Sequence, residues 1–383
     1  MKVMKKVWSL LKGFLVAVSV TAAFSSTAQA AYDSTTFQDA LNAGGTVVLD
    51  ADLTGNFAVP AGVTVTLDLN GYKLDSITSN SSTLTNYGIL TIKDSSGTNA
   101  GTITTSANMA AVMNYGTLAI HGGTFTRSLT SISWYVVRNG DGPGSSALIT
   151  VIDGGVFKEN VSVGDCSLGK ASLFDNYGKI ELIAGGTFSS PYTVMKVEET
   201  ASIDSITGGT FTATGNGPCN TAINVWGDVT ISGGTFTSVN GRAVDQGSWD
   251  DSSHSYSSSL TISGGTFKGG SNSLYLHMGT PNADTGTIAT NITGGSFDGA
   301  ITEVPSTTGI MDLSLSGGQF TDPAAADYLP PGYILKPSGN GYVVQRAMPA
   351  ATAVPTAGHG ALAILGLLLA GLGFLTLRRN RAS

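Results

Sequence analysis

The chain has 383 residues, with 26 acidic residues, 19 basic residues, four histidines and two cysteines. Seven of the basic residues lie in residues 1–30 and 358–383, so residues 31–357 carry a net charge of −14. This acidic balance favours solubility and argues against nucleic acid or anionic lipid as a partner. The histidines are isolated in the sequence and no nucleotide-binding fingerprint is present, so we expect neither a metal site nor a cofactor.

Residues 1–30 show the three parts of a secretory signal peptide. The basic segment MKVMKKVWSLLK precedes the apolar segment GFLVAVSVTAAF, and small residues surround a cleavage site after Ala30. The signal predicts an exported protein whose mature chain begins at Ala31.

The mature chain opens with the pattern of a short capped helix. Asp33 precedes STTFQDALNA, and Gly44-Gly45 follows it. Because a solenoid leaves the apolar face of its first coil exposed, we expect this helix to be its N-terminal cap. Strands are predicted next at 46–49 and 63–69, where Asp68 and Asn70 indicate a turn rather than a calcium site.

One signature, Gly-Gly-x-Phe, then returns eight times at spacings of 23 to 32 residues. A recurrence of roughly 20–50 residues indicates a repeat architecture in which stacked units form the core. Short apolar alternations precede each signature, as in AVMNYGTLAIHGGTF at 111–125, and indicate strands joined by tight corners. We therefore predict a single all-β domain over 31–345, a parallel β-helix of about ten coils.

The Gly-Gly pairs are interpreted as corners that need a positive φ. Each Phe is expected to point inward and stack on its equivalents at about 4.8 Å, the spacing of paired strands. The expected ladder consists of Phe125, Phe157, Phe188, Phe211, Phe236, Phe267, Phe297 and Phe320.

The C-terminal part contains three further elements. Residues 333–335 and 342–344 flank KPSGNG and predict a hairpin that caps the last coil. Residues 346–357 are a Pro- and Ala-rich linker. The apolar run Ala361–Leu377, followed by RRNR, predicts a membrane helix with a cytoplasmic basic tail over 358–383.

Val354-Pro355-Thr356, the apolar run and the basic tail together resemble the I-P-T-L family of bacterial sorting signals, relatives of the signals handled by exosortases. The resemblance implies a sorting transpeptidase or protease as a partner. A permanent, uncut membrane anchor is the alternative. Both place the protein at the cell envelope or in the extracellular space.

The repeats and TLDLNGYKL at 66–74 resemble right-handed β-helix surface proteins of bacteria. This resemblance implies an adhesin-like or structural, non-enzymatic protein of the cell surface or extracellular matrix, with a glycan or surface protein as partner. A polysaccharide lyase or glycoside hydrolase of the pectin-lyase-like fold is one alternative. A non-catalytic glycan-binding module is the other.

Two long loops contain the candidate site residues. Glycoside hydrolysis is catalysed by pairs of carboxylates. Asp250 and Asp251 are therefore candidate catalytic residues, with Arg242 and His254 in the same loop region. Adjacent Asp residues in a Ser-rich loop are also common turn formers. Aromatic side chains that could stack on sugar rings are Trp134, Tyr135, Trp249 and Tyr256.

The two cysteines, Cys166 and Cys219, occupy similar positions two coils apart. An exported protein can form a disulfide, but two coils span about 9.6 Å against a limit of about 7 Å between the Cα atoms. Both lie in longer loops that could shorten this distance, so the pairing stays open.

Overall fold

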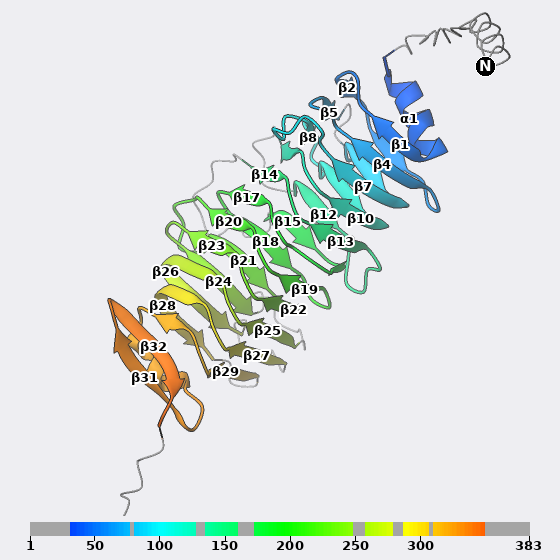
Figure 1. Ribbon diagram of the computed structural model, residues 1–383. Coiled ribbons are helices and arrows are strands. Elements are labelled where there is room, and N and C mark those ends of the chain that lie inside the picture. Colours follow the sequence, from blue (N-terminus) through cyan, green and yellow to red (C-terminus); the bar gives the residue numbers. More distant parts are fainter. Residues whose placement is uncertain are drawn as a thin grey trace, which may run out of the picture.

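The computed structural model describes residues 31–76, 80–127, 135–159, 172–247, 257–278, 286–305 and 309–348. Strands of successive coils pair in parallel and form an elongated solenoid with three walls (Figure 1). The predicted parallel β-helix is confirmed. About ten coils were expected; eleven strands stack in the first wall, and eight turns carry the Gly-Gly-x-Phe signature.

Each described coil contributes one strand to each wall, except that the last coil has no strand in the third wall. The first wall contains β1 Gly45–Val48, β4 Thr64–Asp68, β7 Ile89–Lys93, β10 Thr117–Ile120, β13 Leu148–Ile152, β16 Lys179–Ile180, β19 Ser202–Ile206, β22 Asp228–Ile231, β25 Ser258–Ile262, β27 Thr287–Ile292 and β29 Ile310–Leu315.

The second wall contains the Phe of every signature. Its strands are β2 Leu53–Thr54, β5 Lys73–Asp75, β8 Thr102–Thr105, β11 Thr124–Arg127, β14 Val156–Lys158, β17 Thr187–Ser190, β20 Thr210–Ala213, β23 Thr235–Ser238 and β30 Gln319–Phe320.

The third wall follows the second in every coil. Two long strands, β26 Thr266–His277 and β28 Ser296–Val304, run through both walls. The other strands of the third wall are β3 Phe57–Val59, β6 Leu84–Asn86, β9 Val112–Asn114, β12 Val137–Asn139, β15 Ser172–Asn176, β18 Thr193–Val197, β21 Thr221–Val225 and β24 Arg242–Gly247.

The phenylalanine ladder is confirmed along the second wall. All eight rings are buried, and neighbouring rings stack nearly parallel with centroids 4.5–5.0 Å apart. This offset stacking adds to the burial of apolar area, which is the main source of stability in the core. The apolar pairs that precede the corners, such as Leu118 and Ile120, are buried on the first wall.

The two glycines of each corner are required for different physical reasons. The interpretation that the Gly-Gly pair serves a positive φ is therefore wrong for the first glycine. Only the second has a positive φ, between 93° and 103° in the eight signatures. The first glycine lies against the preceding coil: a Cβ on Gly208 would stand 2.2 Å from the carbonyl oxygen of Ala184. Stacked coils therefore leave no room for a side chain at this position.

A buried asparagine ladder closes the corner from the third wall to the first. The ladder consists of Asn86, Asn114, Asn139 and Asn176, and each of the first three donates an amide hydrogen bond of 2.7 Å to the side-chain oxygen of the next. Because all four are fully buried, these bonds satisfy groups that would otherwise destabilise the core.

Both predicted caps are present. Helix α1, Ser34–Ala43, begins at the N-cap Asp33 and buries Phe37 and Leu41 over the first coil. At the other end, the hairpin of β31 Tyr333–Ser338 and β32 Gly341–Arg346 pairs antiparallel with β30. A 3-10 helix, η2 Pro323–Tyr328, precedes it.

Asp68 acts in a turn, as predicted. Its carboxylate accepts hydrogen bonds from the backbone of Asn70 and Ser95 and contacts Lys93 Nζ at 2.9 Å. No helix among the described residues is long and apolar enough to cross a membrane. The predicted signal peptide and the apolar run Ala361–Leu377 lie outside the described residues.

Candidate functional site

A row of polar side chains runs along the outer face of the third wall. The parallel register aligns one outward residue from each of six successive coils, because the residues before and after it point into the core. We call these residues the charged row. It consists of Arg138, Asp175, Lys196, Asn224, Asp245 and Tyr275.

Ion pairs connect the members of this row to their neighbours. Arg138 Nε lies 3.2 Å from Asp175 Oδ2 on the next coil. Lys196 Nζ lies 2.5 Å from Oε1 of Glu198, which directly follows β18. The cations Arg138 and Lys196 therefore lie on either side of the Asp175 carboxyl group along the solenoid axis.

A second cluster surrounds Asp245. Its Oδ2 atom lies 2.6 Å from Arg242 Nη1, and its Oδ1 atom lies 2.9 Å from His277 Nε2 on the next coil. Gly247 leaves space for this histidine, because a Cβ there would stand 2.8 Å from His277 Cδ2. The carboxylate of Asp245 therefore holds an arginine and a histidine in fixed positions.

Aromatic rings accompany the cations of the row. The Arg138 guanidinium lies 4.9 Å from the ring centre of Tyr177 and 5.4 Å from that of Tyr135. Lys196 Nζ lies 4.1 Å from a ring centre of Trp226. The Arg242 guanidinium lies 3.5 Å from the ring centre of Tyr275. These contacts fix long side chains that would otherwise be mobile.

Burial separates the carboxylates from the rest of the row. Asp175 has no exposed surface and Asp245 only 5%. The side chains of Arg138, Lys196 and Arg242 keep only 12–18% of their surface exposed, and Tyr177 and Tyr275 are half-buried. The cations and rings therefore form the accessible layer, and the carboxylates lie beneath them.

The two buried carboxylates differ in charge. Burial, and then the neighbouring Glu198, raise the pKa of Asp175 to about 8. Burial also tends to raise the pKa of Asp245, but His277 and Arg242 outweigh it and hold this pKa below its usual value. Asp175 is therefore protonated at neutral pH, whereas Asp245 is ionised.

A buried ion pair lies where the second and third walls meet. Arg127 Nη1 contacts Glu159 Oε1 at 3.3 Å, and both side chains are buried. Burial raises the pKa of Glu159 to about 7, although Arg127 opposes the shift. This pair faces the core and is not part of the charged row.

The structure brings together some of the residues that the sequence singled out. The candidate Arg242 forms one cluster with Asp245, which was not among the predicted site residues, and with His277, one of the histidines that are isolated in the sequence. His121 also has a partner, with Nδ1 2.8 Å from Asp153 Oδ1. No group of metal-binding residues occurs among the described residues.

Tyr135 is half-buried next to Arg138, so its ring has a packing contact as well as exposed surface. The other predicted catalytic and sugar-stacking side chains lie outside the described residues: Trp134, Trp249, Asp250, Asp251, His254 and Tyr256.

Cys219 is disulfide-bonded. Cys166, the other cysteine of the chain, lies outside the described residues, so the pairing of these two stays a prediction.

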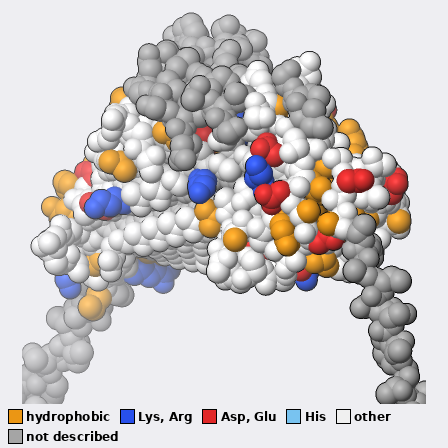
Figure 2. Space-filling model, turned by 90° about the horizontal axis from the view of Figure 1, so that it is seen from above, with side chains coloured by type: hydrophobic (Ala, Val, Ile, Leu, Met, Phe, Trp, Pro, Cys, Tyr) orange, Lys and Arg blue, Asp and Glu red, His pale blue; other side chains and the backbone are white. Residues whose placement is uncertain are grey.

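On the face of the molecule shown in Figure 2, charged side chains are few. Figure 2 shows a mainly white face on which basic and acidic side chains lie next to each other near the centre. Against such a background, a concentrated row of charges and rings is the feature best suited to recognition.

Comparison with known families finds one match, at the C-terminal end. Residues 352–379 match the IPTL-CTERM motif. The chain carries a C-terminal sorting signal. This confirms the predicted class of signal and implies an exported protein processed by a sorting enzyme. Comparisons with curated proteins and with solved structures found no match.

The protonation of Asp175 makes stability depend on pH. An unfolded aspartate has a pKa of about 3.9, so between about pH 4 and pH 8 the folded state binds more protons than the unfolded state. The free energy of unfolding should therefore fall as the pH rises through this window.

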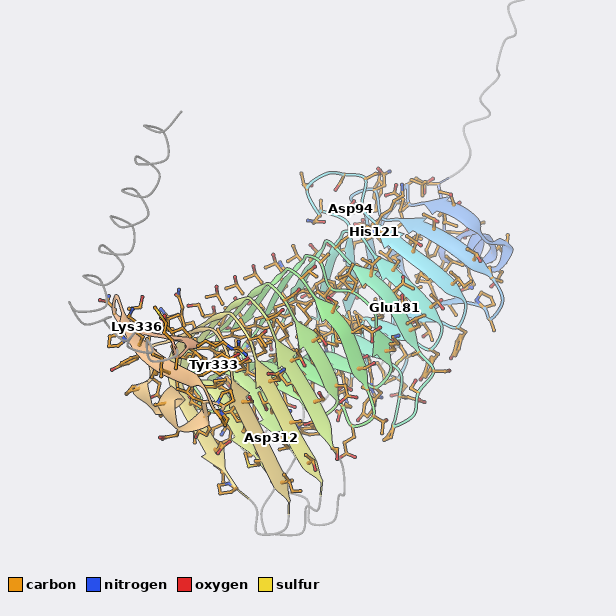
Figure 3. All side chains as sticks on the ribbon, turned by 60° about the horizontal axis from the view of Figure 1, so that its bottom comes forward. Asp94, His121, Glu181, Asp312, Tyr333 and Lys336 are labelled. Carbon is orange, nitrogen blue, oxygen red and sulfur yellow. The ribbon has the colours of Figure 1, made fainter. Side chains whose placement is uncertain are left out.

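Asp175→Asn keeps the shape and cannot ionise, so it should flatten this dependence in urea unfolding measured from pH 5 to pH 8. Burial also raises the pKa of Glu159, so its contribution to the pH dependence of stability has the same sign and should remain in this variant. The matched control is Glu181→Gln, an exposed carboxylate on the first wall (Figure 3). An unchanged slope in Asp175→Asn would refute protonation of Asp175.

Proposed function

We propose that this chain is an adhesin-like surface protein that binds a glycan along the charged row without cleaving it. The C-terminal sorting signal supports display at the cell surface. The solenoid then serves as a rigid support that carries the row outside the cell.

The layered charged row is the observation that carries the proposal. Six coils at about 4.8 Å per step give a row about 24 Å long from its first to its last member. An extended polymer that follows the solenoid axis would meet rings and hydrogen-bonding groups at every coil. Half-buried Tyr177 and Tyr275 offer apolar ring surface with a polar tip, and Arg138 and Arg242 offer donors.

The rigidity of this row favours binding. Each cation is already paired and stacked, so little side-chain entropy is lost when a ligand arrives. The ectodomain is strongly acidic, so neutral polysaccharides are better ligands than acidic ones.

Catalysis is the second candidate, and one observation favours it. Asp175 and Glu198 are neighbours, and burial raises the pKa of Asp175 to about 8. A neutral acid beside a second carboxyl group is the arrangement used in glycoside hydrolysis. However, a catalytic carboxyl group must touch its substrate, and Asp175 is completely buried. The burial therefore favours binding over turnover.

Binding should depend on the half-buried rings. Tyr177→Ala and Tyr275→Ala should each weaken binding to a neutral polysaccharide by about tenfold, equivalent to about 1.4 kcal/mol. Affinity electrophoresis of residues 31–348, which contain the whole described core and both caps, measures this effect. Tyr87→Ala is the matched control, because Tyr87 is exposed and stacks on Tyr115 outside the row. Equal binding by all four proteins would refute a glycan site at the charged row.

A further inference from the structure

At the C-terminal end of the solenoid, the last strands of two of the three walls have hydrogen-bonding partners beyond them. On the second wall, β32 pairs with β30 and continues the sheet. On the third wall, the Asp322 carboxylate accepts a hydrogen bond of 2.7 Å from the backbone N–H of Ile301 on β28. In the first wall, β29 pairs with β27 on one side. The 3-10 helix η2 contacts β29, but no strand pairs with the other edge of β29 among the described residues.

The core side of β29 is also incompletely covered. Met311 and Leu313 align with Ile288 and Thr290 of β27, which are 1% and 2% exposed. On β29 the equivalent side chains are only half-buried, and Ile310 at the start of the strand is 61% exposed. At the opposite end of the solenoid, α1 buries Phe37 and Leu41 completely.

We propose that β29 pairs antiparallel with β29 of a second copy of this chain, forming a symmetric dimer through the C-terminal ends of two solenoids. An unpaired strand edge is a ready template for another strand. A two-fold axis makes such an interface self-complementary. The first walls of the two copies would then form one continuous sheet.

The side chains select one register for this pairing. Opposing residues of an antiparallel pair share a face, so the inward residues of both copies must oppose each other. Placing Leu313 opposite Leu313 of the second copy joins the two cores and sets Met311 opposite Leu315. It also sets Asp312 opposite Ser314. The register centred on Asp312 would place two like charges in direct opposition, which destabilises a sheet.

A second copy fits this edge better than the chain's own linker. The half-buried core residues Met311 and Leu313 are large and need large apolar partners. A second copy supplies Met311, Leu313 and Leu315, whereas residues 349–357 contain Pro, Ala, Thr and a single Val. Figure 3 shows Asp312 on the last strand of the first wall, with Tyr333 and Lys336 on the hairpin at the same end.

A charge-swap series in the full-length chain, measured by sedimentation velocity over a concentration range, tests the dimer and its register. Wild type should show a concentration-dependent dimer. Ser314→Asp places the new carboxylate opposite Asp312 of the second copy, and the two-fold axis repeats this contact. The variant should therefore raise the dimer Kd at least tenfold. Adding Asp312→Lys to this variant turns both contacts into ion pairs and should restore the dimer. Because both side chains point outward, the monomer fold should be preserved.

Leu313→Cys should cross-link two copies under oxidation, whereas Val239→Cys, an exposed control remote from this edge, should not. A wild type that stays monomeric would overturn the proposal, and so would a dimer that Ser314→Asp leaves unchanged. Backbone exchange protection of β29 in the monomer that disappears on deleting residues 349–357 would assign the edge to the linker instead.

Discussion

Phe211→Ala is expected to lower the free energy of unfolding by about 4 kcal/mol, the middle of the range for a buried aromatic side chain. Phe211 is fully buried, and its ring stacks between Phe188 and Phe236 with centroids 4.6 Å away on both sides. Removing the ring leaves a cavity in the middle of the ladder that both neighbours line. Because each coil contacts only its neighbours, the defect cannot be shared across the core.

Urea unfolding followed by circular dichroism measures this change. Val239→Ala is the control, since Val239 is 54% exposed and its truncation should change the stability by less than about 0.5 kcal/mol. A loss below about 1 kcal/mol for Phe211→Ala would contradict the stacked core.

Gly208→Ala is expected to cost about 3 kcal/mol or more, although it adds only a methyl group. The new Cβ would stand 2.2 Å from the carbonyl oxygen of Ala184 and 3.0 Å from its carbonyl carbon. Both are backbone atoms of the preceding coil, so relief requires the coils to separate and their ladder hydrogen bonds to lengthen.

Gly142→Ala is the matched control, because a Cβ at Gly142 meets nothing within 4 Å. Thermal unfolding of the two variants should therefore give a large decrease in Tm for Gly208→Ala and almost none for Gly142→Ala. Similar Tm values would show that the first glycine of the signature does not form a close contact between coils.

The fold could be predicted from the sequence because its determinants are local and repeated. The phenylalanine of each signature has the same position relative to the corner, so eight copies predict one ladder. Asp33 and Gly44 delimit the capping helix through interactions within a single turn. The role of the first glycine was missed, because its constraint comes from another coil and not from its own φ.

The charged row could not be predicted in the same way. Its members are 21 to 37 residues apart, and loops of different lengths separate them. An alignment of the coils on the buried asparagines would have revealed part of the row in the sequence. Arg138 directly precedes Asn139, and Asp175 directly precedes Asn176. The pairing of Asp245 with His277 depends on the register of β24 and β26, which the sequence does not indicate.

The measurement that most directly tests the account follows binding and cleavage together. Residues 31–348 are incubated with a panel of neutral and acidic polysaccharides, and both the protein retained on each polysaccharide and the release of reducing ends or unsaturated products are quantified. The account predicts retention on at least one neutral polysaccharide, with no product released. Product release that Asp175→Asn abolishes would contradict it and assign the charged row to an enzyme.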